Sequence, residues 1–248
     1  MKIVVCINRV PDTETKIKIG SDGKSIDPAG VNFILNPYDD YAIEAALKMK
    51  EAHGGETIAL TLGPESHKDE LRKALAMGVD KAILLKDGTP RDSFSTARAL
   101  ADALTSLGPD CVMFGKQSID YYDEQVPGLV AGLLGFSSVA VAVRLEIRDG
   151  IAHCVREIEG GQEVVEAKLP VVITAQKGLF EPRYPSLKGI MASKTKPIEE
   201  RTPAAYPPVV EVLAMKKPAP KPGGRIVGTD ATAVPELVRL LHEEAKII

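Results

Sequence analysis

Short apolar runs that alternate with segments of helical period are the feature that most constrains the fold of this chain. The runs lie at Ile3–Ile7, Thr57–Leu62, Ala82–Leu85 and Cys111–Phe114, and a further buried strand is predicted at Pro170–Ala175. Parallel neighbours in a sheet need a crossover connection, which is usually a helix. The alternation therefore predicts an α/β fold with a doubly wound, mostly parallel sheet.

The sequence pattern changes after residue 143, where strand-like runs follow one another without helical segments between them. Asp149-Gly150 and Gly160-Gly161 are turn signals between strand-like runs, so we predict a small antiparallel meander. Residues 199–224 are rich in proline and cannot form a compact core, whereas residues 234–248 have the pattern of one amphipathic helix. We therefore expect an α/β domain over residues 1–190 and an extended C-terminal arm over residues 191–248.

The composition argues against several classes of function. A net charge of −3 over 248 residues gives no electrostatic case for nucleic-acid binding. No apolar run approaches the about 20 residues that span a bilayer, and the start is typical of a first strand rather than a signal peptide, so we expect a cytoplasmic protein that does not span a membrane. Cys6, Cys111 and Cys154 lie in apolar sequence, which suits reduced core thiols. The four histidines are scattered without ligand spacing, so no metal site is predicted.

Several predicted strands are followed by loops that contain glycine or polar side chains. These loops are Asn8–Asp12, Leu62–Pro64 and Gly115–Asp120, and Asn36-Pro37 predicts the start of the first helix. In a doubly wound sheet the ligand crevice lies outside the carboxyl ends of the strands. Gln117–Gly128 is the best candidate, because a glycine at a helix start lets backbone N–H groups approach a phosphate and Gln125 can bond a sugar or base. Ordinary strand-to-helix turns explain the same pattern equally well, and neither a G-x-G-x-x-G motif nor a P-loop is present.

An irregular segment, residues 177–191, follows the predicted strand at 170–175. Its two prolines and two glycines forbid a long regular element. It carries six large apolar residues: Leu179, Phe180, Tyr184, Leu187, Ile190 and Met191. Leu179 is either a hydrophobic anchor for another protein or a residue packed back onto the core, and composition leaves both readings open.

The run from Leu179 to Met191, with Lys194-Thr195-Lys196-Pro197-Ile198 behind it, resembles the signature of the electron transfer flavoprotein beta subunit. The resemblance covers nearly the whole chain. The other matching motifs are Val4-Val5-Cys6 to Pro11-Asp12, Asn36-Pro37-Tyr38-Asp39, Leu62-Gly63-Pro64, Ala74-Met77-Gly78-Val79-Asp80, Gly115 to Asp120, and Arg156 to Gly161. The resemblance implies a fold like that of the adenine nucleotide alpha hydrolases.

The same resemblance implies a bound adenine nucleotide, usually AMP. The residues that match the family's contacts are Cys6 (through its backbone), Asn36, Gly63, Asp120, Gln125, Val126, Gly128 and Val130. Pro127, and Val130 where a hydroxyl is often found, depart from the family's pattern. Relatives that bifurcate electrons hold a second FAD in place of AMP and have an NADH site, and this alternative stays open.

The resemblance also implies partners. The electron-carrying FAD lies mostly in an alpha subunit, and Asp12 and Thr13 are candidates for approaching its ring, with a simple polar turn as the alternative. The residues expected to contact a dehydrogenase are Leu179, Phe180, Glu181, Pro182, Arg183 and Tyr184, with Leu179 as the anchor.

The implied function is to pass electrons from acyl-CoA dehydrogenases or other flavin dehydrogenases of fatty acid β-oxidation to electron transfer flavoprotein-quinone oxidoreductase. No residue is expected to break bonds, so we expect an electron carrier rather than an enzyme. A stand-alone nucleotide-binding sensor is the rival from another class, and the proline-rich arm counts against it.

Overall fold

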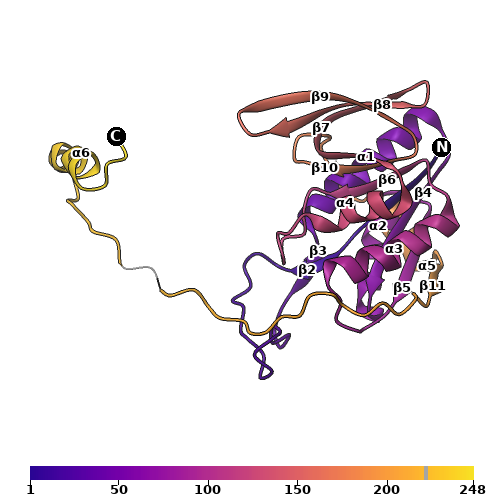
Figure 1. Ribbon diagram of the computed structural model, residues 1–248, viewed down its shortest axis with the longest axis horizontal. Coiled ribbons are helices and arrows are strands. Elements are labelled where there is room, and N and C mark those ends of the chain that lie inside the picture. The colour runs from indigo at the N-terminus through magenta and orange to yellow at the C-terminus, as the bar shows by residue number, and fades with distance from the viewer. Residues whose placement is uncertain (221–222) are drawn as a thin grey trace. The chain divides into compact units, whose positions relative to one another are not determined.

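The apolar runs form the centre of one large sheet. The computed structural model describes residues 1–220 and 223–248. The sheet strands are β1 (Lys2–Cys6), β4 (Glu56–Gly63), β5 (Lys81–Lys86), β6 (Cys111–Gly115), β7 (Ser137–Arg148), β8 (Ile151–Ile158), β9 (Gly161–Lys168), β10 (Val171–Ala175) and β11 (Ile198–Arg201). Their order is β11-β5-β4-β1-β6-β10-β7-β8-β9 (Figure 1). All neighbours from β11 to β7 are parallel, and only β7-β8 and β8-β9 are antiparallel.

Helices cover both faces of this sheet. They are α1 (Pro37–His53), α2 (Lys68–Met77), α3 (Ser93–Leu107), α4 (Gln125–Leu134) and α5 (Leu187–Thr195), with a 3-10 turn η1 at Glu65–His67. Side chains alternate across β1, so Ile3 and Val5 pack in one core with α1 and α2, while Val4 and Cys6 pack in the other with α3 and α4. A strand buried on both faces reads as a continuous apolar run. The predicted doubly wound α/β fold is confirmed.

The predicted meander is present but does not form a separate sheet. Asp149 and Gly150 both have positive φ (49° and 76°), as a tight hairpin turn requires, and they connect β7 to β8. Because β7 also pairs in parallel with β10, the meander extends the main sheet. The one separate sheet among the described residues consists of the short strands β2 (Arg9–Pro11) and β3 (Phe33–Leu35).

The compact body extends further along the chain than residue 190. The chain divides into two units, Met1–Leu213 and Ala214–Ile248. Residues 191–213 belong to the first unit because β11 pairs with β5, the Arg72 guanidinium donates to the carbonyls of Ser193 and Lys196, and the Tyr206 ring lies 4.1 Å from the Arg98 guanidinium carbon. The domain boundary was expected at residue 190, and the first unit ends at Leu213, so it also includes β11 and the extended segment that follows β11.

The second unit contains the 3-10 turn η2 (Ala231–Ala233) and the helix α6 (Val234–Glu243). The helix ends at Glu243, five residues before the predicted end at residue 248. Residues 221 and 222, within the predicted proline-rich stretch, lie outside the described residues. No helix in the described parts of the chain is both long enough and apolar enough to cross a membrane.

The three cysteines are buried and unpaired, as predicted. Burial raises the pKa of each thiol, that of Cys154 to about 11, which keeps them protonated and unreactive at neutral pH.

Candidate functional site

The sheet order places a switch point between β1 and β6. After β1 the chain winds outward through β4 and β5, and after α3 it returns to the other side of β1 as β6. After β7, β8 and β9, strand β10 pairs between β6 and β7. A crevice opens where the strand order reverses, outside the carboxyl ends of the two strands. The residues at these ends are Cys6, followed by Ile7 and Asn8, and Gly115, followed by Lys116.

The start of α1 joins these two strand ends. Asp39, in the first turn of α1, accepts hydrogen bonds from the backbone N–H of Asn8 (2.7 Å) and of Gly115 (3.1 Å). The Asn36 side chain donates to Asp39 (3.0 Å) and to the Gln117 carbonyl (2.9 Å), and its oxygen accepts from Ile119 N–H (3.3 Å). Asn36 is 1% exposed, and both its amide nitrogen and its amide oxygen bond to the protein. We conclude that Asn36 organises the crevice rather than presenting a free amide to it.

Asp39 is a buried carboxylate that the sequence analysis did not select. Burial raises its pKa to about 7, and the N–H donors of Asn8, Asn36 and Gly115 oppose that rise. A Cβ on Gly115 would lie 2.4 Å from Asp39 Oδ1 and 2.7 Å from the Tyr38 carbonyl carbon, so glycine is required there. An acid in a first helical turn is ordinarily a dipole complement, and nothing in the local sequence distinguishes Asp39 from its neighbour Asp40.

Asp120 is connected to the same network. Asn8 Nδ2 donates to Ser118 Oγ (2.9 Å), and the Ser118 hydroxyl donates to Asp120. Asp120 is exposed and also accepts the backbone N–H of Tyr121 at 2.9 Å. The structure thus brings Asp120, Asn36 and the backbone beyond Cys6 into one hydrogen-bonded group at the switch point.

The N-terminus of α4 is open. Its N-cap, Glu124, has a left-handed backbone (φ 54°), and no side chain caps the first turn. Gln125 and Gly128 are exposed, Val126 is half-buried, and a Cβ on Gly128 would meet no atom within 4 Å. An uncapped N-terminal turn with free space beside it has the backbone donors and the dipole that a phosphate requires.

Val130 does not belong to this opening. Its side chain is 0% exposed and packs in the core between α3, α4 and the sheet. Helical periodicity turns the side chain at position 130 inward while position 128 faces out. Contact between Val130 and a nucleotide stays a prediction.

Gly63 lies under the ring of His67. A Cβ at this position would lie 2.3–2.6 Å from three atoms of the His67 ring, which covers the end of β4. Burial, and then the charge of Arg9, lowers the pKa of His67 to about 4, so the ring is neutral at pH 7. A ligand contact at Gly63 stays a prediction.

Asp12 and Thr13 lie in the long loop between β2 and β3. Asp12 closes this loop by accepting from Asn32 Nδ2 (3.2 Å) and from the backbone N–H of Glu14 (3.1 Å). An open cavity of about 450 Å³ lies along the loop, lined by Asp12, Glu14, Thr15, Lys16, Lys18, Asp27, Ala29, Gly30, Val31 and Asn32. The turn predicted as the alternative for Asp12 is thus present, and contact with a flavin stays a prediction.

Leu179 packs onto the core. It is 6% exposed and belongs to the buried cluster of α1 and the sheet, while Phe180 is half-buried against that cluster. In this conformation Leu179 is therefore not an exposed anchor. The backbone N–H of Leu179 donates to the Gln176 carbonyl (3.2 Å), and the turn that this bond closes after β10 directs the Leu179 side chain inward. Whether Leu179 contacts a partner stays a prediction.

The exposed apolar surface of segment 177–191 lies further along. Tyr184 is 95% exposed, Leu187 84% and Met191 65%. Glu181 is exposed as well, while Pro182 and Arg183 are half-buried. The part of this segment that could contact another protein without rearrangement is therefore centred on Tyr184 and Leu187.

Comparison with known proteins relates the chain to one family. Residues 24–206 match the family model described as "Electron transfer flavoprotein domain". The chain is 42% identical over 225 residues to the electron transfer flavoprotein subunit beta of Syntrophomonas wolfei, a match that covers 90% of this chain and 88% of that protein. It is 39% identical to the subunit beta of Bacillus subtilis and 34% identical to the mitochondrial subunit beta of Oryza sativa subsp. indica, in both cases over 100% of each chain.

Proposed function

Because the chain belongs to the electron transfer flavoprotein beta-subunit family, we propose that it pairs with an alpha subunit and serves as half of an electron carrier. In this role it helps pass electrons from acyl-CoA dehydrogenases or related flavin dehydrogenases to a quinone oxidoreductase. The FAD that accepts and releases these electrons is held mainly by the alpha subunit. This chain supplies positioning and electrostatics, while the flavin supplies the redox chemistry.

The proposed nucleotide site is the switch point between β1 and β6, and AMP is the proposed ligand. The observation that carries this proposal is the uncapped first turn of α4, where free space at Gly128 lies beside the N–H groups of Gln125 and Val126, Pro127 having none. The phosphate would bind these N–H groups, and Gln125 and Asp120 would bond the sugar or base. The buried Asn36 and Asp39 would hold the two strand ends in place without touching the ligand.

The donor set fits a phosphate because little negative charge would oppose it in the first turn of α4. The first turn contains no acidic residue, and Glu124, which precedes it, has Lys116 Nζ 3.8 Å away. At the crevice end of β6, Gly115 lies against Asp39 and Tyr38 with no room for a side chain.

Partner contacts are proposed for two regions. The segment around Tyr184 and Leu187 would contact the dehydrogenase, since it is the exposed apolar part of segment 177–191. The loop that carries Asp12 and Thr13 would approach the flavin of the alpha subunit.

Extraction of the bound nucleotide from the purified heterodimer tests the nucleotide site. We expect one AMP and one flavin per heterodimer. Two flavins per heterodimer would support the bifurcating alternative, with a second FAD in place of AMP, and would refute the AMP assignment.

A matched pair of variants locates the site. Gly128→Glu places a carboxylate at the first turn of α4, and Gly132→Glu places one a turn later, where an added Cβ also meets no atom within 4 Å. We expect Gly128→Glu to fold but to lose most of its nucleotide, and Gly132→Glu to keep it. Equal nucleotide content in the two variants would place the phosphate elsewhere.

A further inference from the structure

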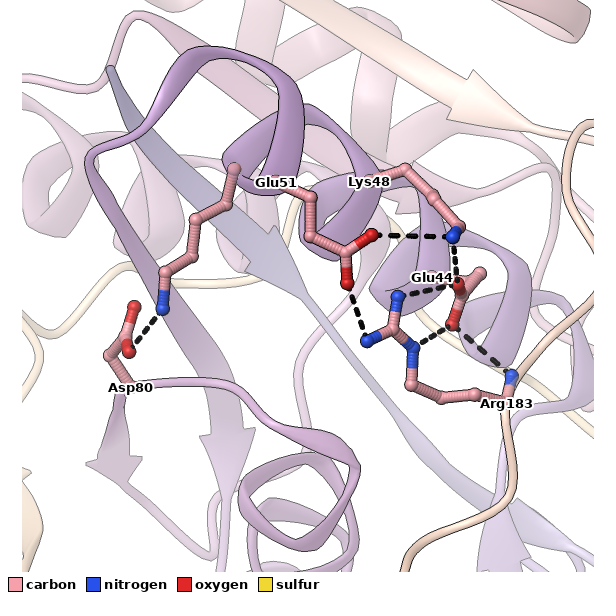
Figure 2. Close-up of polar contacts among 6 residues, drawn as sticks. Glu44, Lys48, Glu51, Asp80 and Arg183 are labelled. Carbon is pink, nitrogen blue, oxygen red and sulfur yellow. Dashed lines mark hydrogen bonds and ion pairs between the residues drawn. The ribbon is translucent and has the colours of Figure 1, made fainter.

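A buried carboxylate on α1 holds the middle of segment 177–191. Arg183 Nε donates to Glu44 Oε2 at 2.7 Å and Arg183 Nη2 to Glu44 Oε1 at 2.8 Å, which is a bidentate pair (Figure 2). The backbone N–H of Arg183 also donates to Glu44 Oε2, at 3.1 Å. The Glu44 side chain is 2% exposed, so one desolvated carboxylate fixes both the side chain and the backbone of residue 183.

The outer contacts of this group are more exposed. Arg183 Nη1 lies 2.7 Å from Glu51 Oε1, and Lys48 Nζ lies 3.2 Å from the other Glu51 oxygen (Figure 2). Glu51 and Lys48 are each about half exposed (49% and 47%), and ion pairs at such positions contribute little. The contact that holds residue 183 in place is therefore the one with Glu44.

The segment is also fixed on either side of Arg183. Before it, Leu179 lies in the core. After it, the Ser186 hydroxyl accepts Gly189 N–H at 3.0 Å and caps α5, and α5 lies so close to α2 that a Cβ on Gly189 would be 2.3 Å from the Ala76 carbonyl oxygen. Tyr184 and Leu187 are thus held outward between fixed points, and Pro182 and Pro185 restrict the backbone between them.

We propose that Glu44 is a positioning residue for partner docking: by holding Arg183, it fixes the conformation in which Tyr184 and Leu187 face the dehydrogenase. This inference rests on the docking role proposed above. Glu44 itself is buried and touches no partner. Its effect is to reduce the ordering that segment 177–191 must undergo when a partner binds.

This role predicts a specific kinetic pattern. If loss of the Glu44 contact leaves about a tenth of the molecules in the docking conformation, the apparent dissociation constant rises about tenfold, because only the competent fraction binds. Electron transfer within the docked complex involves no atom of Glu44. The KM of the dehydrogenase for the flavoprotein should therefore rise, and kcat should stay within about twofold of the parent.

The test uses the purified heterodimer, with an acyl-CoA dehydrogenase reduced by its substrate as the electron donor. Glu44→Gln removes the charge and keeps the shape, and Arg183→Lys keeps the charge but loses the bidentate geometry. Lys50→Gln is the matched control, because it removes another α1 ion pair, with Asp80 at 2.5 Å, that does not involve Arg183. We expect about a tenfold higher KM for Glu44→Gln, a smaller rise for Arg183→Lys and no change for Lys50→Gln.

A double variant and a backbone measurement separate positioning from general loosening. If Glu44 acts through Arg183, Glu44→Gln combined with Arg183→Lys should show the KM of the worse single variant, whereas independent effects would multiply. Hydrogen exchange at the Arg183 amide should be faster in Glu44→Gln and unchanged in Lys50→Gln. If Glu44→Gln does not fold, Arg183→Lys, at a site 33% exposed, decides by the same two measurements.

The inference is overturned if Glu44→Gln and Arg183→Lys leave KM within about twofold of the parent, if Lys50→Gln raises it equally, or if kcat falls while KM is constant. A parental heterodimer that the reduced dehydrogenase cannot reduce would instead refute the proposed docking function, and the inference with it.

Discussion

Truncation of Leu179 should destabilise the fold, whereas truncation of Leu187 should not. Leu179 is 6% exposed and packs in the core, and Leu187 is 84% exposed at the first position of α5. Replacing a buried leucine by alanine costs the transfer free energy of the lost carbons and leaves a cavity, about 2–5 kcal/mol together. For an exposed leucine the expected change is within about 0.5 kcal/mol, and alanine is also a good helix former.

The two variants should differ clearly in thermal unfolding followed by circular dichroism. At about 2–4 °C per kcal/mol for a body of this size, a loss of about 3 kcal/mol lowers Tm by about 6–12 °C for Leu179→Ala. Leu187→Ala should melt within about 2 °C of the parent. The same pair separates folding from docking, because Leu187→Ala should slow reduction by the dehydrogenase at unchanged stability.

The reasoning is refuted if Leu179→Ala melts with the parent and slows dehydrogenase-driven reduction. That result would mean that Leu179 contributes nothing to the core and acts as the exposed anchor predicted from the sequence.

Two further predictions concern the ends of β6 and β4. Gly115→Ala should lower the free energy of unfolding by at least about 1–3 kcal/mol, because its Cβ would lie 2.4 Å from Asp39 Oδ1. Gly128→Ala has open space for its Cβ and should leave the stability in urea unchanged or raise it. A Gly115→Ala variant as stable as the parent would contradict the packing at the crevice. Burial and the charge of Arg9 lower the pKa of His67 from 6.5 to about 4. Between these two pH values the unfolded chain binds more protons than the folded chain, so the stability should fall as the pH decreases from about 6.5 to about 4. His67→Gln should show a smaller loss of urea midpoint between pH 7 and pH 5 than the parent, and parallel losses would show that His67 is not the group that titrates.

Local signals in the sequence were enough to predict the architecture. Apolar runs alternate with helical segments because of short-range preferences and because the strands are buried on both faces. This pattern can therefore be read from the sequence without knowing which residues are in contact. The hairpin at Asp149-Gly150 and the start of α1 at Asn36-Pro37 are equally local, because each depends on the backbone angles of one or two residues. The segment from Leu179 to Met191 was specific enough to indicate the family.

Side-chain environments were predicted less well. The Asn36 amide bonds to Asp39, Gln117 and Ile119, and the Val130 side chain faces the core, while contact of either residue with a ligand stays a prediction. Asp39 was quoted only as part of a family motif, and Glu44 was not selected. An acid in a helix has the same local signal whether it is exposed or buried, and only the packing of distant elements distinguishes the two.

Periodicity, turn residues and one long specific motif were enough to predict the fold class, the central strands with the helices between them, and the family. The strands β2, β3 and β11 were not predicted, and neither was the helix α5, which begins inside the segment expected to be irregular. Only the packed chain shows which side chain of segment 177–191 is buried, where the compact body ends, and what holds Arg183. Each of these depends on contacts between residues far apart in the chain, such as Glu44 and Arg183, which are 139 positions apart, and such contacts leave no periodic trace in the sequence.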